Sequence, residues 1–350
     1  MSPYRALRPL LFRLPAETAH RAVHSLLGAT QRVGLDRPLA RRYAIDDDRL
    51  QVDAFGKQFP NPVGVAAGFD KNAELPRALA GLGFGFVEVG GVTASPQSGN
   101  ARPRMFRLRE DEALINRMGL NNEGAAAVGR RLARTDAPVP VGVNVAKSEE
   151  VPLEEAAGDY RETYDAVGEH ADFVVVNVSC PNSQGFRELQ SREPMERILQ
   201  ALLDAGAAPL LVKLSPDLPD PAMEDAVDLV NDLGLDGVVA TNTTTDRPAS
   251  LRSPNRVEEG GLSGAPIESA ATEAVRFVAE RTDAPVIGVG GVSTPEGAYR
   301  KIRAGASLVQ LYTALVYRGP SVARQINRGL LDLLERDGFD SVEDAVGADL

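Results

Sequence analysis

The chain has 350 residues, of which 43% are hydrophobic and 25% charged, enough for one large globular domain with a small appendage. Its formal net charge of -11 argues against nucleic acid as a partner. A single cysteine, Cys180, excludes an intrachain disulfide, and only three histidines make a structural metal site unexpected. No run of 18 apolar residues occurs, which excludes a membrane-spanning helix.

Residues 1–45 form a basic leader. They carry eight arginines and only two acidic residues, whereas acidic residues outnumber basic ones in the rest of the chain. Apolar side chains at helical spacing in residues 7–14 and 19–27 predict two short amphipathic helices. Such a leader would suit an anionic membrane surface, and the alternative is a solvated helix face. We therefore predict a helical extension over residues 1–45 and a catalytic domain over residues 46–350.

Eight short apolar runs follow the leader, after a predicted β-hairpin around Gly56. Each run is almost continuously hydrophobic, as expected for strands that are buried on both faces. The runs are residues 63–68, 86–92, 141–146, 173–179, 210–215, 237–243, 286–291 and 308–313. Helix-like segments lie between them and after the last one. This alternation predicts an α/β fold, a (β/α)8 TIM barrel with a short N-terminal helical extension; a doubly wound open sheet is the alternative.

Polar residues stand at the ends of most of these runs, at the rim where barrel active sites are built. The glycines of residues 288–291, followed by a helix opening near Pro295, suit a phosphate. Lys213 lies inside an apolar run and needs an anionic partner, which is not evident nearby in the sequence. Lys71 could pair with a carboxylate. The amides that could match the edge of a pyrimidine ring belong to Asn116, Asn177, Asn182 and Asn242.

Cys180 follows the fourth run directly, between Ser179 and Pro181. A thiolate in this loop could act as a general base or as a nucleophile. No histidine lies nearby in the sequence to activate it, which favours proton abstraction over hydrolysis by a Cys–His pair. The alternative is a small buried core residue without a chemical role.

At these positions the sequence resembles the dihydroorotate dehydrogenases, and specifically their membrane-associated, quinone-using class 2. The resemblance covers nearly the whole chain and is carried by residues 66–72, 98–100, 103–107, 116–122, 177–182, 240–244, 260–264 and 305–312. It implies an FMN-dependent oxidation of dihydroorotate to orotate in pyrimidine biosynthesis, with a quinone as electron acceptor. It also implies peripheral attachment to the cytoplasmic side of the cell membrane.

The resemblance assigns a role to individual residues. The FMN contacts that it implies are Ala67, Gly68, Lys71, Asn144, Asn177, Lys213, Thr241, Gly264, Gly291, Tyr312 and Thr313. The dihydroorotate contacts are Lys71, Asn116, Arg117, Met118, Gly119, Leu120, Asn177, Asn182, Asn242 and Thr243. Cys180 would remove a proton from C5 of dihydroorotate. His20 and Arg107 would line a quinone channel that the leader covers. The alternative for His20 is a hydrogen-bonded histidine on the helix face, and the alternative for Arg107 is a salt bridge at the barrel rim.

Two positions depart from the class 2 pattern. Class 2 enzymes usually have serine as the base, whereas Cys180 matches the soluble class 1 enzymes, so a class 1-like enzyme using fumarate or NAD is an alternative. The family tends to have threonine where Gly91 stands, which affects a flavin contact. A tRNA dihydrouridine synthase would also combine FMN, a barrel and a cysteine, but the acidic charge disfavours RNA. A barrel that only binds a phosphorylated ligand would leave Lys213 and Cys180 unexplained.

Overall fold

A closed barrel of parallel strands forms the centre of the molecule, in a computed structural model that describes residues 3–179 and 188–350. Around the barrel the strands neighbour one another in the order β10-β12-β13-β3-β4-β7-β8-β9. In chain order they are β3 (Val63–Val65), β4 (Phe86–Val92), β7 (Val141–Val145), β8 (Phe173–Asn177), β9 (Leu210–Leu214), β10 (Gly237–Ala240), β12 (Val286–Val289) and β13 (Ala306–Leu311). Each coincides with a predicted run, so the predicted TIM barrel is confirmed and the doubly wound sheet is wrong.

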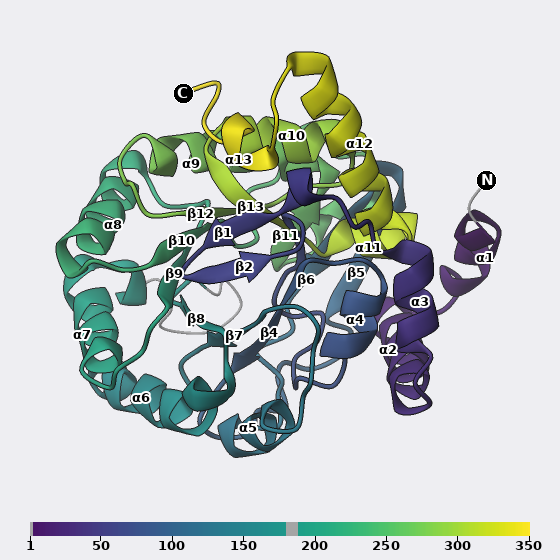
Figure 1. Ribbon diagram of the computed structural model, residues 1–350. Helices are drawn as coiled ribbons and strands as arrows, with labels where there is room; N and C mark the ends of the chain where they lie inside the picture. Colours follow the sequence, from purple (N-terminus) through teal and green to yellow (C-terminus); the bar gives the residue numbers. More distant parts are fainter. Residues whose placement is uncertain (1–2, 180–187) are drawn as a thin grey trace.

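Helices surround the barrel on its outside (Figure 1). They cover the outer faces of the strands, and for this reason the strand residues are apolar on both faces. Sequence also sets where the helices begin: Thr294 Oγ1 accepts a hydrogen bond from the Gly297 N–H at 3.1 Å, and Pro295 stands where no N–H is needed. The surrounding helices are α4 (Pro76–Gly81), α5 (Ala125–Leu132), α6 (Ala156–Val167), α7 (Arg192–Leu203), α8 (Asp220–Leu233), α9 (Glu268–Ala279), α10 (Pro295–Arg303), α11 (Thr313–Arg318), α12 (Val322–Asp337) and α13 (Val342–Ala345).

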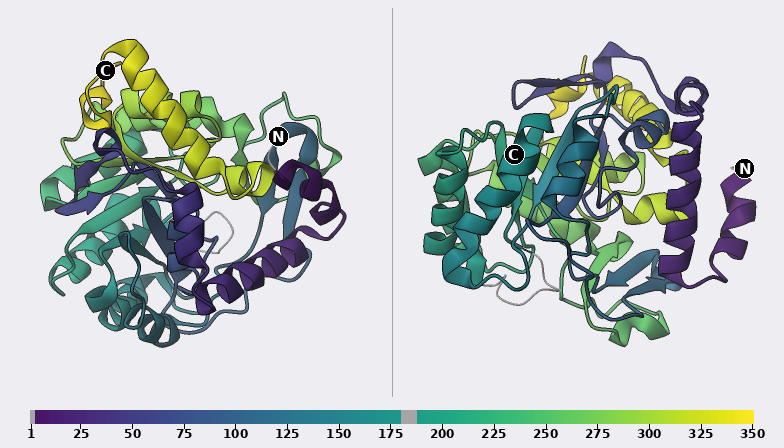
Figure 2. Two further views of the ribbon diagram at one scale, coloured as in Figure 1. Left: turned by 45° about the vertical axis from the view of Figure 1, so that its right-hand side comes forward. Right: turned by 90° about the horizontal axis from the view of Figure 1, so that it is seen from below.

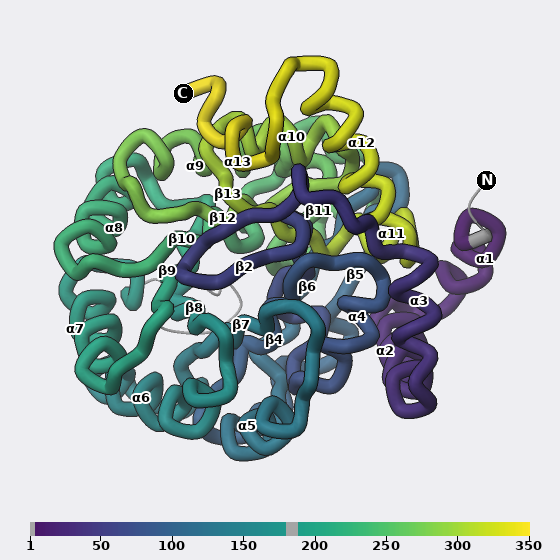
Figure 3. Tube along the Cα trace, in the orientation of Figure 1, coloured from purple at the N-terminus to yellow at the C-terminus, as the bar shows by residue number. Residues whose placement is uncertain are grey.

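The N-terminal end of the barrel is closed by the predicted hairpin around Gly56. Its strands β1 (Val52–Ala54) and β2 (Lys57–Phe59) pair antiparallel and cross in front of the barrel in the tube view (Figure 3). Phe55 and Phe59 of the hairpin pack against Phe86 and Phe173 of the barrel, with ring centroids 5.3–6.3 Å apart. This aromatic cluster fills one end of the barrel, so a ligand has access only from the other end.

The opposite end carries a three-stranded antiparallel sheet, which is formed by the connections after β4 and β10. Its strands are β5 (Met105–Leu108), β6 (Ala113–Asn116) and β11 (Gly261–Gly264), with β6 in the middle. The right-hand view of Figure 2 shows this sheet and the hairpin at opposite ends of the barrel. The hydroxyl of Tyr317 donates to the carbonyls of Leu108 (3.1 Å) and Ala113 (2.9 Å), which ties the sheet to α11.

The leader lies against one side of the barrel and the small sheet (Figures 1 and 2). Its helices are α1 (Pro3–Leu11), α2 (Ala16–Arg32) and α3 (Asp36–Tyr43), so the two predicted helices are present and a third follows them. Asp36 begins α3 and pairs with Arg77 of α4 at 2.7 Å, while Glu17 of α2 pairs with Arg104 at 2.9 Å. Among the described residues, no helix is long and apolar enough to cross a membrane.

Candidate active site

The barrel-mouth cavity lies between the C-terminal ends of the strands and the small sheet, and encloses about 1200 Å³ including its open mouth. All eleven residues predicted to contact FMN line it. Of the remaining residues predicted to hold dihydroorotate, Asn116, Asn242 and Thr243 line it too. The structure therefore brings these residues together from seven barrel strands or the loops that follow them, and from β6 of the small sheet, as expected from the convergence of parallel strand ends.

Some predicted substrate residues do not line this cavity. The guanidinium of Arg117 pairs with Glu258 at 3.0 Å and stacks on the Phe106 ring, 4.5 Å from its centroid. The carbonyl of Met118 accepts a hydrogen bond from the Asn100 N–H at 3.0 Å. Gly119 and Leu120 follow in the same loop, both with left-handed backbone. Cys180 and Asn182 lie outside the described residues.

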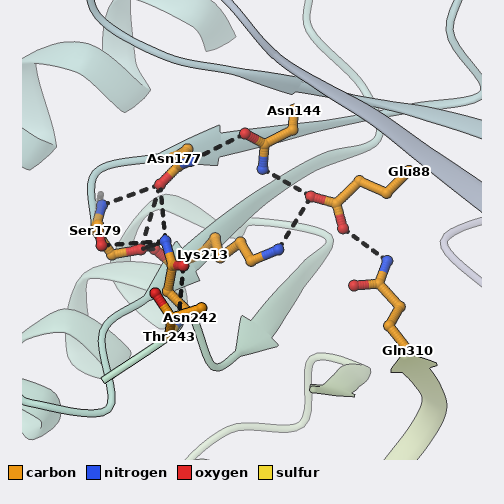
Figure 4. A network of polar contacts seen from close by, with 8 residues as sticks. All are labelled: Glu88, Asn144, Asn177, Ser179, Lys213, Asn242, Thr243 and Gln310. Atoms are coloured by element: carbon orange, nitrogen blue, oxygen red, sulfur yellow. Dashed lines mark hydrogen bonds and ion pairs between the residues drawn. The ribbon is translucent and has the colours of Figure 1, made fainter. Parts of the chain in front are cut away.

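A buried carboxylate, Glu88 of β4, organises the floor of the cavity (Figure 4). Its Oε1 accepts from Asn144 Nδ2 at 2.7 Å and lies 3.4 Å from the ammonium of Lys213. Its Oε2 accepts from Gln310 Nε2 at 2.6 Å. Glu88 is fully buried and the Lys213 side chain is 6% exposed, so the ion pair lies in a region of weak solvent screening.

The network continues through amides toward the cavity (Figure 4). Asn177 Nδ2 donates to Asn144 Oδ1 at 3.0 Å, and Asn242 Nδ2 donates to Asn177 Oδ1 at 3.4 Å. Ser179 closes the network, because its hydroxyl donates to the Lys213 carbonyl at 2.8 Å and accepts from Asn242 at 3.1 Å. Since each amide both donates and accepts within the network, the orientations of Asn144 and Asn177 are fixed before a ligand binds.

Glu88 and Gln310 were missed by the sequence reasoning. Glu88 is the anionic partner that Lys213 requires, and it lies 125 positions away in the chain. Its signal was a carboxylate in the middle of the apolar run 86–92, the same signal by which Lys213 was singled out. Gln310 stands within the apolar run of β13, and its Oε1 is buried without a hydrogen-bond partner in the described part of the chain. A donor from a ligand would satisfy this oxygen.

The opposite wall of the cavity has the features of a phosphate cradle. Gly264 and Gly291 adopt φ of +107° and +73°, which favour glycine. A Cβ on Gly264 would lie 2.5 Å from the carbonyl oxygen of Glu112, and one on Gly291 would lie 2.4 Å from the Cα of Glu268. The space that a Cβ would take at either position is filled by other parts of the protein, so both glycines present only main chain to the cavity that they line. Together with the buried Lys213 and the unsatisfied Gln310 oxygen, the residues present fit a flavin mononucleotide.

Gly91 also lines the cavity, and a larger residue there would be tightly packed. A Cβ at this position would lie 3.0 Å from Leu120 Cδ2 and 3.1 Å from Asn144 Oδ1. A threonine would therefore have to displace Leu120 or turn the amide of Asn144.

A second cavity, the leader cavity, lies between α1, α2, the small sheet and α11 and encloses about 1010 Å³ including its mouth. Its lining is mostly apolar, and it includes both His20 and Arg107. Met105, Leu114 and Tyr312 line both cavities, so a single layer of side chains separates them. This arrangement places the leader cavity next to the barrel-mouth cavity.

The two predicted quinone-channel residues both line this cavity, where Arg107 is buried and His20 is partly buried. Burial lowers the pKa of His20 to about 4, with smaller contributions from His24 and Lys71, so its ring is neutral at physiological pH. Arg107 lies 4.7 Å over the Phe12 ring and donates to the carbonyls of Leu11 and Leu14. Within residues 3–179 and 188–350 it contacts carbonyls and an aromatic ring rather than a carboxylate, so the alternative of a rim salt bridge is wrong.

Comparisons with known proteins agree with this architecture. The family model described as dihydroorotate dehydrogenase matches residues 49–334. A relative from Haloarcula marismortui named dihydroorotate dehydrogenase (quinone) is 71% identical, covering all of both chains. A relative of the same name from Halobacterium salinarum is 66% identical, covering 99% of this chain and all of its own.

A crystal structure of a dihydroorotate dehydrogenase from Eimeria tenella, in complex with ferulenol, superposes with a TM-score of 0.90 at 38% identity. The alignment covers 97% of this chain and 98% of that one. These matches confirm the resemblance to class 2 and disfavour the class 1-like, dihydrouridine synthase-like and non-enzymatic alternatives. The chain belongs to the dihydroorotate dehydrogenase family, a family of oxidoreductases, and within it to the quinone-dependent class.

Proposed function

We propose that this chain oxidises dihydroorotate to orotate in pyrimidine biosynthesis, with FMN in the barrel-mouth cavity and a quinone as the final electron acceptor. The observation that carries the proposal is that all eleven predicted FMN contacts line one cavity, above the buried pair of Glu88 and Lys213. The names of the relatives support the choice of a quinone.

FMN bound in this cavity would supply the hydride acceptor for the oxidation of dihydroorotate. Gly264 and Gly291 would hold its phosphate, because both line the cavity and present only main chain to it. Lys213 would stand at the N1/C2 edge of the flavin, where negative charge gathers on reduction. Glu88 balances the lysine before that charge arrives, which makes the buried ammonium tolerable in the oxidised protein.

Dihydroorotate would lie above the flavin. Lys71 would pair with its carboxylate, and Asn116, Asn177 and Asn242 would contact the ring edges that present both donors and acceptors. Cys180 would remove the proton from C5. A thiol suits this role because its ordinary pKa, about 8.5, is close to working pH.

The quinone would enter through the leader cavity, with its head group close to Tyr312 and the flavin beyond. His20 is neutral, so it can donate a hydrogen bond to a quinone oxygen without bringing a charge into an apolar cavity. We propose that residues 1–45 form the quinone-associated extension and residues 46–350 the catalytic domain. Leu7, Leu10 and Leu26 are exposed, which supports peripheral contact of the leader with the cytoplasmic face of the cell membrane.

The test is an anaerobic spectrum of the purified protein before and after addition of dihydroorotate. We expect one FMN per chain and bleaching of its absorbance by dihydroorotate. Lys213→Ala should reduce the flavin far more slowly. Lys57→Ala, which removes a partly exposed lysine at the other end of the barrel, is the control and should reduce its flavin as the wild type does. Protein without flavin, or flavin that dihydroorotate does not bleach, would contradict the proposed function; normal reduction by Lys213→Ala would contradict only the role of that lysine.

A further inference from the structure

Lys301 of α10 is a fully buried lysine for which the proposed function has no use. Its ammonium donates to the main-chain carbonyl of Glu268 at 3.2 Å and to the hydroxyl of Thr272 at 2.8 Å. Both acceptors are neutral, and among the described residues no carboxylate lies within ion-pair distance of this ammonium. A buried ammonium without a counter-charge is destabilising, so a bound anion nearby would compensate its charge.

The ammonium lies behind the phosphate cradle. Glu268 connects the two, because its carbonyl accepts from Lys301 while its Cα would lie 2.4 Å from a Cβ on Gly291. On the barrel side, Lys301 Cδ would lie 3.2 Å from a Cβ on Gly288 of β12. With standard backbone dimensions, these contacts place the ammonium within about 10 Å of the Gly291 Cα.

The charged groups around Lys301 leave its positive charge uncompensated. The Glu268 carboxylate at the start of α9 pairs with Arg300 of α10, so these two charges offset each other. The adjacent strand β12 contributes only valine, isoleucine and glycine. Burial, with a smaller contribution from Arg300 and against the attraction of Glu268, lowers the pKa of Lys301 to about 7. Its charge near neutral pH therefore depends on whether an anion is present.

We propose that Lys301 is a positioning residue for the phosphate of FMN: its ammonium lies behind the Gly291 main chain and strengthens binding when the phosphate occupies the cradle. This inference rests on the proposed function, since it requires FMN in this cavity. At an effective dielectric constant of about 20, one pair of unit charges about 10 Å apart changes an affinity roughly tenfold. The phosphate carries nearly two charges, but Lys301 is partly neutral in the free protein, so we expect about tenfold.

The experiment compares FMN with riboflavin, which has the same ring system but no phosphate. Full-length protein is stripped of flavin, and the quenching of flavin fluorescence gives Kd for both ligands. Lys301→Met should weaken FMN binding about tenfold and leave riboflavin binding unchanged. Lys147→Met is the matched control, because Lys147 is also buried and its acceptors among the described residues are main-chain carbonyls. It follows β7, across the barrel from β12, and should change neither Kd.

A pH series on the wild type provides a second test, which needs no variant and is therefore unaffected by whether Lys301→Met folds. Between pH 7 and 9 the phosphate is already a dianion, because its second pKa is about 6. The ratio of FMN to riboflavin affinity should fall over this range as Lys301 loses its proton. The inference would be overturned if Lys301→Met lost equal affinity for FMN and riboflavin, or lost none. It would also be overturned if the wild-type ratio of FMN to riboflavin affinity were independent of pH. Wild-type protein that binds neither flavin would instead overturn the proposed function.

Discussion

The Glu88–Lys213 pair offers the sharpest test of how the cavity floor is held together. Glu88→Gln keeps the shape of the side chain and removes only its charge. The new amide would face Gln310 Nε2, but Gln310 can turn and accept through its Oε1, which is free of partners among the described residues. The hydrogen bonds to Gln310 and Asn144 are therefore retained. What is lost is the charge that compensates Lys213, 3.4 Å away with a side chain 6% exposed.

Breaking a buried ion pair on one side typically costs about 3–5 kcal/mol, and we expect this loss for Glu88→Gln in the flavin-free protein. The double variant Glu88→Gln/Lys213→Met removes the stranded charge and should recover most of the stability. Urea denaturation followed by circular dichroism measures the free energy of unfolding of the wild type, Glu88→Gln, Lys213→Met and the double variant. Asp165→Asn is the control, because its pairing with Arg161 is exposed and should contribute less than about 1 kcal/mol. Additive losses in the double variant would refute the pairing.

Three further predictions concern the base, the leader and its attachment. In stopped-flow experiments, Cys180→Ala should reduce flavin roughly 10²-fold more slowly than the wild type while still binding FMN. Cys180→Ser should keep some activity, with its optimum at higher pH. Flavin reduction by Cys180→Ala at the native rate would place the base elsewhere. Deleting residues 1–45 should abolish quinone reduction and vesicle binding but spare flavin reduction, and a truncated protein that still reduces quinone would contradict this.

The attachment prediction concerns His24 of the leader, which lies 3.9 Å from Asp70 and 3.6 Å from Glu74 of the barrel rim. Burial opposes its charge, but these carboxylates outweigh burial and raise its pKa above 6.5. The contact therefore stabilises leader docking fully below about pH 6.5 and is lost as pH rises through the raised pKa. Proteolysis of the leader should accelerate in the wild type as pH rises from about 6.5 through the raised pKa, and should not do so in His24→Leu. Equal pH dependence of proteolysis in both proteins would contradict this role of His24.

The barrel was predictable because its signal is local. Strands buried on both faces read as continuous apolar runs, and the convergence of their C-terminal ends then places Asn144, Asn177 and Lys213 on one rim without any knowledge of the loops. The small sheet was not predictable in this way. β5 and β6 are neighbours in the chain, but β11 joins them from more than a hundred positions away, and short strands leave little periodicity to read.

Within the site, the ion-pair partner of Lys213 was unpredictable for the same reason. A charge in an apolar run indicates that a partner exists, but the periodicity of a strand does not say which strand supplies it. Glu88 and Lys213 come from β4 and β9, which are not adjacent in the barrel, so their contact depends on the closed geometry. The packing of Leu120 against Gly91 depends likewise on the course of a loop. Such contacts follow from the tertiary structure and not from local pattern.

The most direct test of the central claim is the reoxidation of the dihydroorotate-reduced protein by different acceptors. Flavin is first reduced anaerobically with dihydroorotate, and the recovery of its absorbance is then followed after rapid mixing with a quinone, fumarate or NAD⁺. The position of the leader cavity, one layer of side chains from the barrel-mouth cavity, predicts rapid recovery with the quinone and slow recovery with the other two. Rapid recovery with fumarate or NAD⁺ and none with the quinone would contradict the assignment.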